Sequence, residues 1–399
     1  MLDYIDPSQS YSLYVHIPFC GRKCDYCAFY SEVPSSKGIM GSLSDQLESE
    51  LGLLVDHLRV PFDTIYFGGG DPGMLPIDTL VRLLSLSQKR GKARETTMEM
   101  NPEHIRKEHS VLFSHGMDRL SVGIQSMNGR HLSTLGRNAT IESIEHAMDT
   151  IRSLRTFHEF RLNCDLMTCI PGQTIPDALE DIDSLVEGFA PDHISLYNLT
   201  VEEGTPLANR MSKGTLHVMD EDEQAVLLHA CWEQLEGYGY VHYEVSNFSI
   251  DVDHRSKHNE RYWKLLPYIG LGPSAAGTLF LHPSHAMRST GVAHVAEYCA
   301  GGPFSAYHFE EIDRDALMLE TILVALRTSD GIDIDRWNER FSDDFNSRFG
   351  KTIATIMQHM EGVCILSPHR FSLTGKGFMV LDSIVLELAG QVGPLDSEK

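Results

Sequence analysis

Three cysteines near the start of the chain, Cys20, Cys24 and Cys27, lie within eight residues in the spacing CxxxCxxC. Thiolates this close together can hold an iron–sulfur cluster from a single loop. A structural zinc site would instead need four ligands, usually from two CxxC pairs. Three cysteines leave one iron of a 4Fe–4S cube without a protein ligand, and a reactive metal needs such an open position. The spacing therefore predicts a 4Fe–4S cluster with one free iron.

A second group of candidate residues forms the pattern HNxxYW, which consists of His258, Asn259, Tyr262 and Trp263. Histidine is a ligand of heme iron, and aromatic side chains can stack on a porphyrin. Three cations near the pattern could pair with the two propionates of a heme: Arg255, Lys257 and Arg261. The same residues also fit a loop that packs its aromatic side chains onto the fold and closes its mouth. The pattern alone leaves both interpretations open.

The elements that must position these residues are visible in the first three hundred residues. Six short apolar runs, rich in Val, Ile, Leu, Tyr and Phe, lie at residues 13–18, 64–67, 96–100, 120–124, 162–167 and 193–199. Helical patterns separate them at residues 42–58, 78–89, 104–115, 140–156 and 176–188. This alternation predicts a parallel α/β sheet with buried strands. An open barrel of six units and a doubly wound sheet both fit the pattern.

Polar and glycine residues follow the predicted strands directly. Cys20 follows the first strand, Gly68–Gly70 the second, Asn101 the third and Gln125 the fourth. In parallel α/β folds, functional residues gather at the carboxyl ends of the strands. We therefore expect these segments to converge on one site.

A boundary between two domains, 1–300 and 301–399, is predicted at Gly301–Pro303. Beyond it, helical spacing at residues 319–326 and 353–360 is followed by two short strands at 363–365 and 371–373, which suggests a winged-helix-like module. Such modules often bind DNA. This segment has 9 Lys and Arg against 16 Asp and Glu, so a structural or lid role is expected instead.

Charge and composition exclude several classes of function. The 399 residues include 33 Lys and Arg against 56 Asp and Glu, a net charge of −23, which disfavours nucleic acid as a partner. No apolar run approaches the ~20 residues of a membrane span. The first residues lack the basic region of a secretory signal, so the protein is interpreted as cytoplasmic, where disulfides are rare. Cys164 and Cys169 are accordingly interpreted as packing thiols.

The cysteine motif after a first strand, with a glycine-rich end to the second, resembles the radical S-adenosylmethionine superfamily. The segment Tyr14-Val-His-Ile-Pro-Phe-Cys20 is similar to the oxygen-independent coproporphyrinogen III oxidase family, which includes the HemW-type heme chaperones. Further similar segments extend along the chain at residues 67–70, 98–102, 119–125, 163–165, 171–174, 193–197, 202–206, 243–247 and 373–377. The resemblance implies a six-unit open (β/α) barrel with a small C-terminal helical domain.

The resemblance also implies a second cofactor, S-adenosylmethionine, bound to the free iron of the cluster. The positions that match its binding residues are Tyr14, Tyr26, Gly69, Gly70, Glu99, Gln125, Arg137 and Asp165. Three residues depart from the family pattern: Asp71, Cys169 and Ala276. Asp71 replaces the usual Thr, Cys169 the usual Gly and Ala276 a frequent His, so no ligand role is assigned to position 276.

Two features point to the chaperone branch of the family. The HNxxYW pattern is typical of that branch, and Phe29 stands where the decarboxylase branch has a fourth cysteine. The expected function is a heme chaperone that delivers heme to an apo-hemoprotein such as a respiratory enzyme. The alternative is an enzyme, coproporphyrinogen III oxidase or another radical tetrapyrrole enzyme, served by an electron donor such as flavodoxin or ferredoxin. A redox or structural cluster protein is a third alternative.

Overall fold

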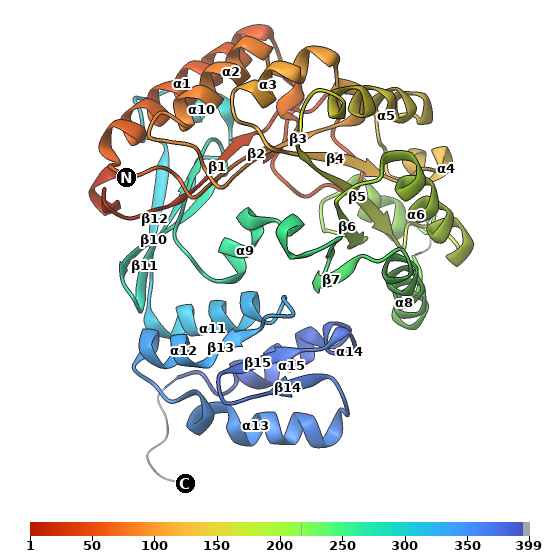
Figure 1. The fold of residues 1–399 in the computed structure, drawn as a ribbon, viewed down its shortest axis with the longest axis vertical. Helices are drawn as coiled ribbons and strands as arrows, with labels where there is room; N and C mark the ends of the chain where they lie inside the picture. Colours follow the sequence, from red (N-terminus) through yellow and green to blue (C-terminus); the bar gives the residue numbers. More distant parts are fainter. Residues whose placement is uncertain (217, 394–399) are drawn as a thin grey trace.

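A sheet of twelve strands forms the centre of the computed structural model, which describes residues 1–216 and 218–393. Its strand order is β12-β11-β10-β9-β1-β2-β3-β4-β5-β6-β8-β7 (Figure 1). The two edge strands, β12 (Tyr307–Ile312) and β7 (Val241–Glu244), do not pair with each other, so the sheet curves without closing. The fold is therefore an open α/β barrel, as the resemblance to the radical S-adenosylmethionine superfamily implies, and not the doubly wound sheet that the sequence pattern also fits.

Six strands pair in parallel and in the order of the sequence. They are β1 (Ser12–Ile17), β2 (Thr64–Gly69), β3 (Glu95–Met100), β4 (Arg119–Gln125), β5 (Arg161–Thr168) and β6 (His193–Asn198). Helices α1 (Lys37–His57), α2 (Ile77–Ser87), α5 (Ile141–Arg155) and α6 (Ile175–Phe189) lie on the outer face (Figure 1). The strands are apolar along most of their length because both faces of the sheet are buried, the outer face by these helices.

One predicted helix, at residues 104–115, is wrong in extent. The segment forms two 3₁₀ turns, η3 (Pro102–His104) and η4 (Lys107–His109), before the short α3 (Ser110–Ser114). Arg106 has an extended backbone with φ −137°, which interrupts the helical pattern. The apolar residues keep helical spacing on both sides of a break in the backbone, where Ile105 and Arg106 are both extended.

Further strands extend the sheet at both edges. β9 (Tyr268–Leu271) pairs in parallel with β1, and β10 (Ala276–His282), β11 (His285–Gly291) and β12 continue antiparallel from it. At the other edge, β8 (Asn247–Ser249) pairs with β6 and β7. The remaining elements around the sheet are η1 (Leu2–Tyr4), η2 (Pro72–Met74), α4 (Gly129–Thr134), α7 (Pro206–Ser212), α8 (Glu221–Gly237), η5 (Val252–His254), α9 (Lys257–Trp263) and α10 (Val295–Tyr298).

The C-terminal segment contains a small three-stranded sheet in the order β13-β15-β14. Its elements are α11 (Arg314–Ala325), β13 (Ile332–Asp333), α12 (Ile334–Phe341), α13 (Phe345–His359), β14 (Cys364–Leu366), β15 (Arg370–Leu373), α14 (Gly375–Phe378) and α15 (Leu381–Ala389). The predicted hairpin is present as β14 and β15. Residues 394–399 of the predicted second domain lie outside the described residues.

Strand β12 affects the boundary that the sequence places at residue 300. It lies after that boundary, yet it pairs along its whole length with β11 of the main sheet. The division into 1–300 and 301–399 stays a prediction, and this pairing favours a boundary after Ile312.

The C-terminal segment also contacts the edge of the main sheet. The Val245 backbone N–H donates to the Arg327 carbonyl at 2.8 Å, and the Ser329 N–H donates to the Tyr243 carbonyl at 2.9 Å. An antiparallel bridge between Glu244 and Thr328 lies between these bonds. Residues 327–329 thus follow the edge strand β7 as a short additional strand.

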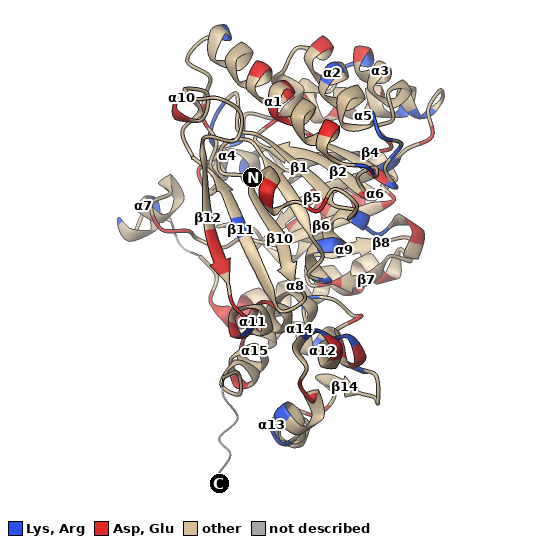
Figure 2. Cartoon of the chain, turned by 90° about the vertical axis from the view of Figure 1, so that its left-hand side faces the viewer, with Lys and Arg blue, Asp and Glu red and all other residues tan. Residues whose placement is uncertain are grey.

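Acidic residues are spread over the outer helices and over β12 (Figure 2). Within residues 1–216 and 218–393, no helix combines the length and the apolar character that crossing a bilayer requires.

Candidate functional site

The three cysteines lie in the loop that connects β1 to α1, at the carboxyl edge of the parallel strands. The loop is closed at its base by two backbone bonds, from Cys20 N–H to Glu32 O at 3.0 Å and from Glu32 N–H to Pro18 O at 2.8 Å. All three cysteines are half-buried and form no disulfide. Burial raises the pKa of Cys20 to about 11 and also raises the pKa of Cys27. Metal binding would therefore release protons from these thiols.

Arg137 connects this loop to the ends of two strands. Its Nη1 lies 3.5 Å from the Cys24 Sγ, and its Nη2 donates to the Gly123 carbonyl at 2.5 Å and to Asn101 Oδ1 at 2.9 Å. Its Nε is buried and has no partner among the described residues. The cation therefore holds the Cys24 thiol, β3 and β4 in one arrangement.

The cysteines suit a cluster better than a single ion. No three His, Cys, Asp or Glu side chains of the described residues are gathered closely enough to hold one metal ion. A 4Fe–4S cube binds each cysteine through a different iron, so its ligands stand further apart than those of one ion. The unpaired thiols at one loop, beside a guanidinium, fit that group.

The glycines at the end of β2 are required by close approach of the backbone. Gly69 has φ +105°, and a Cβ there would lie 2.3 Å from the ring of His16. A Cβ on Gly70 would lie 2.5 Å from the Phe19 carbonyl oxygen, beside the cysteine loop. The Gly70 N–H donates to Ile17 O at 2.8 Å. The β2 end is therefore pressed against the base of the cluster loop, as the convergence argument predicts.

Two carboxylates project from neighbouring parts of the sheet into its interior. Glu99 accepts from the Tyr66 hydroxyl and from the Gly69 N–H, the latter at 3.0 Å. Burial, with the charge of Asp165 nearby, raises the pKa of Glu99 to about 7. Burial also raises the pKa of Asp165, whose Oδ1 accepts from Asn163 Nδ2 at 2.8 Å. Both carboxylates line a small polar cavity of about 30 Å³ inside the sheet.

The other predicted S-adenosylmethionine residues lie around these groups. The Tyr14 hydroxyl bonds His16 Nδ1 at 2.9 Å. Tyr26 packs against an apolar cluster that includes Leu135 and Met167. Burial raises the pKa of Tyr26, and the charge of Arg137 partly opposes this shift. Gln125 ends β4 with φ +68°, at an irregularity in the pairing with β5. The eight predicted positions are thus all at or near the carboxyl edge or the inner face of the sheet.

The structure shows the surroundings of Asp71 and the backbone conformation of Cys169, two of the departures from the family pattern. Asp71 is fully buried; its Oδ2 lies 2.6 Å from His104 Nδ1, and its Oδ1 accepts from the Gly73 N–H at 3.0 Å. Both oxygens are engaged, so an additional contact to a bound ammonium is not needed to explain the residue. Cys169 has φ +57°, in the left-handed region that favours glycine, which is the usual family residue there.

The HNxxYW segment forms helix α9, which lies inside the curve of the sheet (Figure 1). The His258 Nδ1 bonds the Thr64 hydroxyl at 2.7 Å, and its Nε2 bonds the Tyr262 hydroxyl at 2.7 Å. Its side chain is completely buried. Thr64 begins β2, so His258 packs at the amino end of the strands, opposite to the cysteine loop. Strand β2 has six residues, and at about 3.3 Å per residue its amino and carboxyl ends lie roughly 17–20 Å apart.

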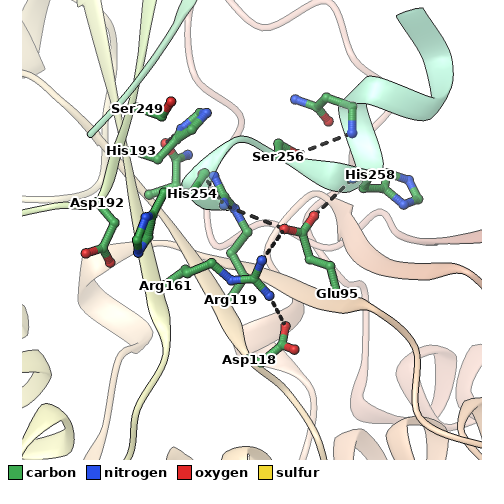
Figure 3. A network of polar contacts seen from close by, with 12 residues as sticks. Glu95, Asp118, Arg119, Arg161, Asp192, His193, Ser249, His254, Ser256 and His258 are labelled. Carbon is green, nitrogen blue, oxygen red and sulfur yellow. Dashed lines mark hydrogen bonds and ion pairs between the residues drawn. The ribbon is translucent and has the colours of Figure 1, made fainter. Parts of the chain in front are cut away.

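A buried charge network holds α9 at this end of the sheet (Figure 3). Glu95 accepts from the His258 backbone N–H at 3.0 Å and lies 3.2 Å from Arg161 Nη1 and 3.7 Å from Arg119 Nη1. Arg119 in turn donates to the His254 carbonyl at 3.0 Å. Two of the three predicted propionate partners are also engaged: Arg261 pairs with Asp63 at 2.9 Å, and Arg255 pairs with Asp330 at 3.5 Å.

These contacts bear on the heme-contact prediction. Neither ring nitrogen of His258 is free, so binding iron would require that one of its two hydrogen bonds breaks. Asn259 faces the small polar cavity shared with Glu99 and Asp165, and Trp263 lines a separate cavity beside the C-terminal segment. The structure therefore places the four residues of the pattern in three different environments. This arrangement matches the second interpretation of the sequence, a segment that packs its aromatic side chains and closes the fold.

The burial of His258 predicts an acid-sensitive fold. Burial lowers the pKa of His258 to about 3, while an unfolded histidine titrates near about 6.5. The unfolded state therefore binds the proton first, and stability falls by about 1.4 kcal/mol per pH unit from this residue as pH drops from about 6.5 towards 3. Urea unfolding of His258→Gln at several pH values should give a shallower decline than the wild type. His229→Gln, at an exposed site, should keep the wild-type slope; parallel curves for both variants would refute the expectation.

A hydrogen-bonded chain of residues without a predicted role leads through the interior to Asp165. The Ser256 N–H donates to the Tyr243 hydroxyl at 3.2 Å, and that hydroxyl lies 2.7 Å from His193 Nε2. The His193 Nδ1 lies 2.6 Å from Asn163 Oδ1, and Asn163 donates to Asp165. Sequence reasoning marked these segments only as similar to the family. Asn163 and His193 could have been found from the sequence, because polar residues inside apolar strands need hydrogen-bond partners.

Comparison with protein-family models defines the class of protein. Residues 14–185 match the model of the radical SAM superfamily, and residues 312–380 match the model of the HemN C-terminal domain. Membership of the radical SAM superfamily implies a 4Fe–4S cluster and S-adenosylmethionine as cofactors, and the unpaired cysteines beside Arg137 fit the cluster.

Curated relatives are similar over nearly the whole chain. The "Radical S-adenosyl methionine domain-containing protein 1, mitochondrial" of Danio rerio is 30% identical over 94% of this chain and 86% of its own length. The "Heme chaperone HemW" of Mycobacterium tuberculosis is 30% identical over 96% of both chains, and that of Lactococcus lactis is 29% identical over 92% and 94%. The chain therefore belongs to the HemW family within the radical SAM superfamily.

A solved structure gives an independent view of the fold. The coproporphyrinogen III oxidase HemN of Escherichia coli, described as a radical SAM enzyme, superposes with a TM-score of 0.79. The alignment covers 97% of this chain and 92% of that chain, at 19% identity. This similarity confirms the predicted fold, including the C-terminal domain.

Proposed function

We propose that the protein is a heme chaperone that binds heme reversibly and passes it to an apo-hemoprotein. The observation that carries the proposal is the similarity to HemW chaperones along nearly the whole length of both chains. The position that carries a fourth cysteine in the decarboxylase branch is Phe29, whose side chain is 74% exposed and offers no ligand. The proposed place of action is the cytoplasm.

Cys20, Cys24 and Cys27 are the proposed ligands of the 4Fe–4S cluster, with one iron left free. Bound at that iron, S-adenosylmethionine would supply one-electron radical chemistry to the site. Glu99 and Asp165 have the acceptor oxygens that ribose hydroxyls require. The backbone of Gly69 and Gly70 lets a ligand approach the sheet end closely. Arg137 keeps Cys24 oriented, since it fixes the loop against β3 and β4.

The remaining predicted contacts, Tyr14, Tyr26 and Gln125, would complete the S-adenosylmethionine site from the inner face of the sheet. The proposed partners are heme, an apo-hemoprotein recipient such as a respiratory enzyme and, if the radical chemistry is used, an electron donor such as flavodoxin or ferredoxin.

A heme titration beside an enzyme assay tests the function. Heme added to the anaerobically reconstituted protein should give a Soret shift that saturates at a fixed stoichiometry. Incubation with coproporphyrinogen III, S-adenosylmethionine and a reductant should release no CO₂ above the level seen with a cysteine-triad variant. Turnover to CO₂ and 5′-deoxyadenosine without stoichiometric heme binding would overturn the chaperone proposal in favour of the enzyme.

The role of His258 is tested by the same titration. If His258 is an axial ligand, His258→Ala should move the Soret maximum and weaken heme binding at least about tenfold, or ~1.4 kcal/mol. An unchanged affinity and spectrum would leave His258 as the anchor of α9, the role that its two hydrogen bonds support. His16, close to the cluster loop, would then be the next histidine to replace.

A further inference from the structure

A cavity of about 230 Å³ lies where α9 and β7 meet the C-terminal segment, and we call it the interdomain cavity. It is separate from the cysteine loop, which lies at the carboxyl edge of the parallel strands. Helix α9, which borders the cavity, packs instead at the amino end of these strands. Its walls come from both parts of the molecule: Trp263 from α9 on one side, and Trp337 from α12 on the other.

The charge of this cavity is unusual for so acidic a protein. Five cationic side chains line it, against the three carboxylates of Glu260, Asp330 and Asp333: Arg255, Lys264, Arg336, Arg340 and Arg370. Two of the carboxylates are already paired, Glu260 with Lys264 at 3.4 Å and Asp330 with Arg255 at 3.5 Å. The surplus positive charge therefore lies on the wall made by α12 and β15.

Arg336 and Arg340 are two of these cations that form no ion pair with a carboxylate of the described residues. They are four residues apart on α12, so their side chains lie on one face of the helix. Within the described part of the chain, Arg336 has no side-chain hydrogen bond or ion pair. Arg340 donates to the Leu265 carbonyl at 3.2 Å, and its guanidinium lies over the Phe280 ring, 4.7 Å from the ring centroid. Burial lowers the pKa of both, and the charge of Arg336 helps to lower that of Arg340 to about 10. Two partly buried like charges repel each other unless an anion lies between them.

Two indole groups line the interdomain cavity. Trp337 is 1% exposed, and its Nε1 has no hydrogen-bond partner within residues 1–216 and 218–393. The Nε1 of Trp263, on the opposite wall, is likewise buried without a described partner.

We propose that the interdomain cavity binds a small ligand that carries two anionic groups, carboxylates or phosphates, held between Arg336 and Arg340. Its volume is smaller than the roughly 300–1,000 Å³ of sites that enclose drug-sized molecules, so a whole porphyrin does not fit. A free diphosphate-like or dicarboxylate compound fits, and so do the propionates at the edge of a larger ring. The site does not depend on the proposed chaperone function.

Titration calorimetry of the full chain with inorganic diphosphate tests the site without any heme. The wild type should bind with a dissociation constant of about 1 mM or tighter, and Arg336→Gln/Arg340→Gln should bind at least about tenfold more weakly. Arg82→Gln/Arg152→Gln, at two exposed sites, is the matched control and should bind like the wild type. No binding by the wild type, or equal binding by the α12 double variant, would overturn the proposal.

A second measurement keeps the test valid if the double variant folds poorly. The chain has three tryptophans, and two of them line the interdomain cavity, so Trp232→Phe leaves both reporters in place. Diphosphate should change the tryptophan emission of Trp232→Phe, and adding Arg336→Gln alone should weaken that response at least about tenfold. An emission change that Arg336→Gln leaves intact would also overturn the proposal.

Heme distinguishes the two sources of the anionic groups. If heme competes with diphosphate and its affinity falls in the α12 double variant, the cavity receives the propionates. If heme affinity is unchanged while diphosphate binding is lost, the cavity serves a free anion. Both results support the anion site, and only the first connects it to the chaperone function.

Discussion

Replacing Cys20, Cys24 and Cys27 together by Ser is expected to remove all cluster iron from the protein. Purified anaerobically, the wild type should be brown, with about four irons and four sulfides per chain, because a cube contains four of each. A serine oxygen is a far weaker ligand for this iron than a thiolate, so the variant should be colourless. Iron and sulfide analysis, with the visible spectrum, measures the loss.

The other cysteines provide the controls for this experiment. Cys299 is half-buried like the three loop cysteines, so Cys299→Ser is the best-matched single control. Cys231→Ser and Cys364→Ser should also retain the full iron content. If any of these three variants loses the cluster, the assignment of the ligands to the β1–α1 loop is wrong.

Replacing Glu95 by Ala is expected to lower the free energy of unfolding by about 3–5 kcal/mol. Arg119 is 2% exposed, and the substitution leaves its charge buried without the carboxylate that faces it. The amino end of α9 also loses the acceptor for the His258 N–H. Urea unfolding at neutral pH, followed by circular dichroism, measures the difference.

The control for Glu95 is an ion pair of similar length at the surface. Glu48 pairs with Arg82 at 2.9 Å, with the arginine side chain 53% exposed. Because exposed pairs contribute little, Glu48→Ala should cost less than about 1 kcal/mol. Equal losses for Glu95→Ala and Glu48→Ala would show that the network at the amino end of the strands does not hold α9.

The sequence was sufficient for the parallel sheet and for the convergence at its carboxyl edge. Nearly continuous apolar runs have few alternatives to buried strands, and parallel pairing then brings the strand ends together. The contacts of Gly70 with the Phe19 carbonyl and of Arg137 with Cys24 follow this logic. At the carboxyl edge of the sheet, the apolar strand pattern and the three-dimensional arrangement therefore agree.

The sequence was insufficient for the HNxxYW segment. A histidine between basic residues and aromatic residues can face a ligand or the core, and nothing in the local pattern decides between them. The decision depends on Thr64 and Glu95, which lie 194 and 163 residues earlier in the chain. Only the three-dimensional arrangement brings those two partners to His258.

The interdomain cavity was also beyond sequence reasoning. Arg336 and Arg340 look like an ordinary solvated helix face, and the overall negative charge of their segment argues against an anion site. In the structure the two arginines line a cavity instead. Its other wall contains Trp263 and Arg255, which come from a distant part of the chain.

The short strand formed by residues 327–329 has a consequence for how the protein must be produced. An unpaired strand edge is a template for pairing with other molecules, so edges that are not covered promote aggregation. At the β12 edge, Glu310 and Glu311 supply charges that discourage such pairing. At the β7 edge, the C-terminal segment itself covers the backbone. A fragment that ends at Ile312 would expose that edge, and its self-association would follow from the lost cover rather than from a misfolded barrel.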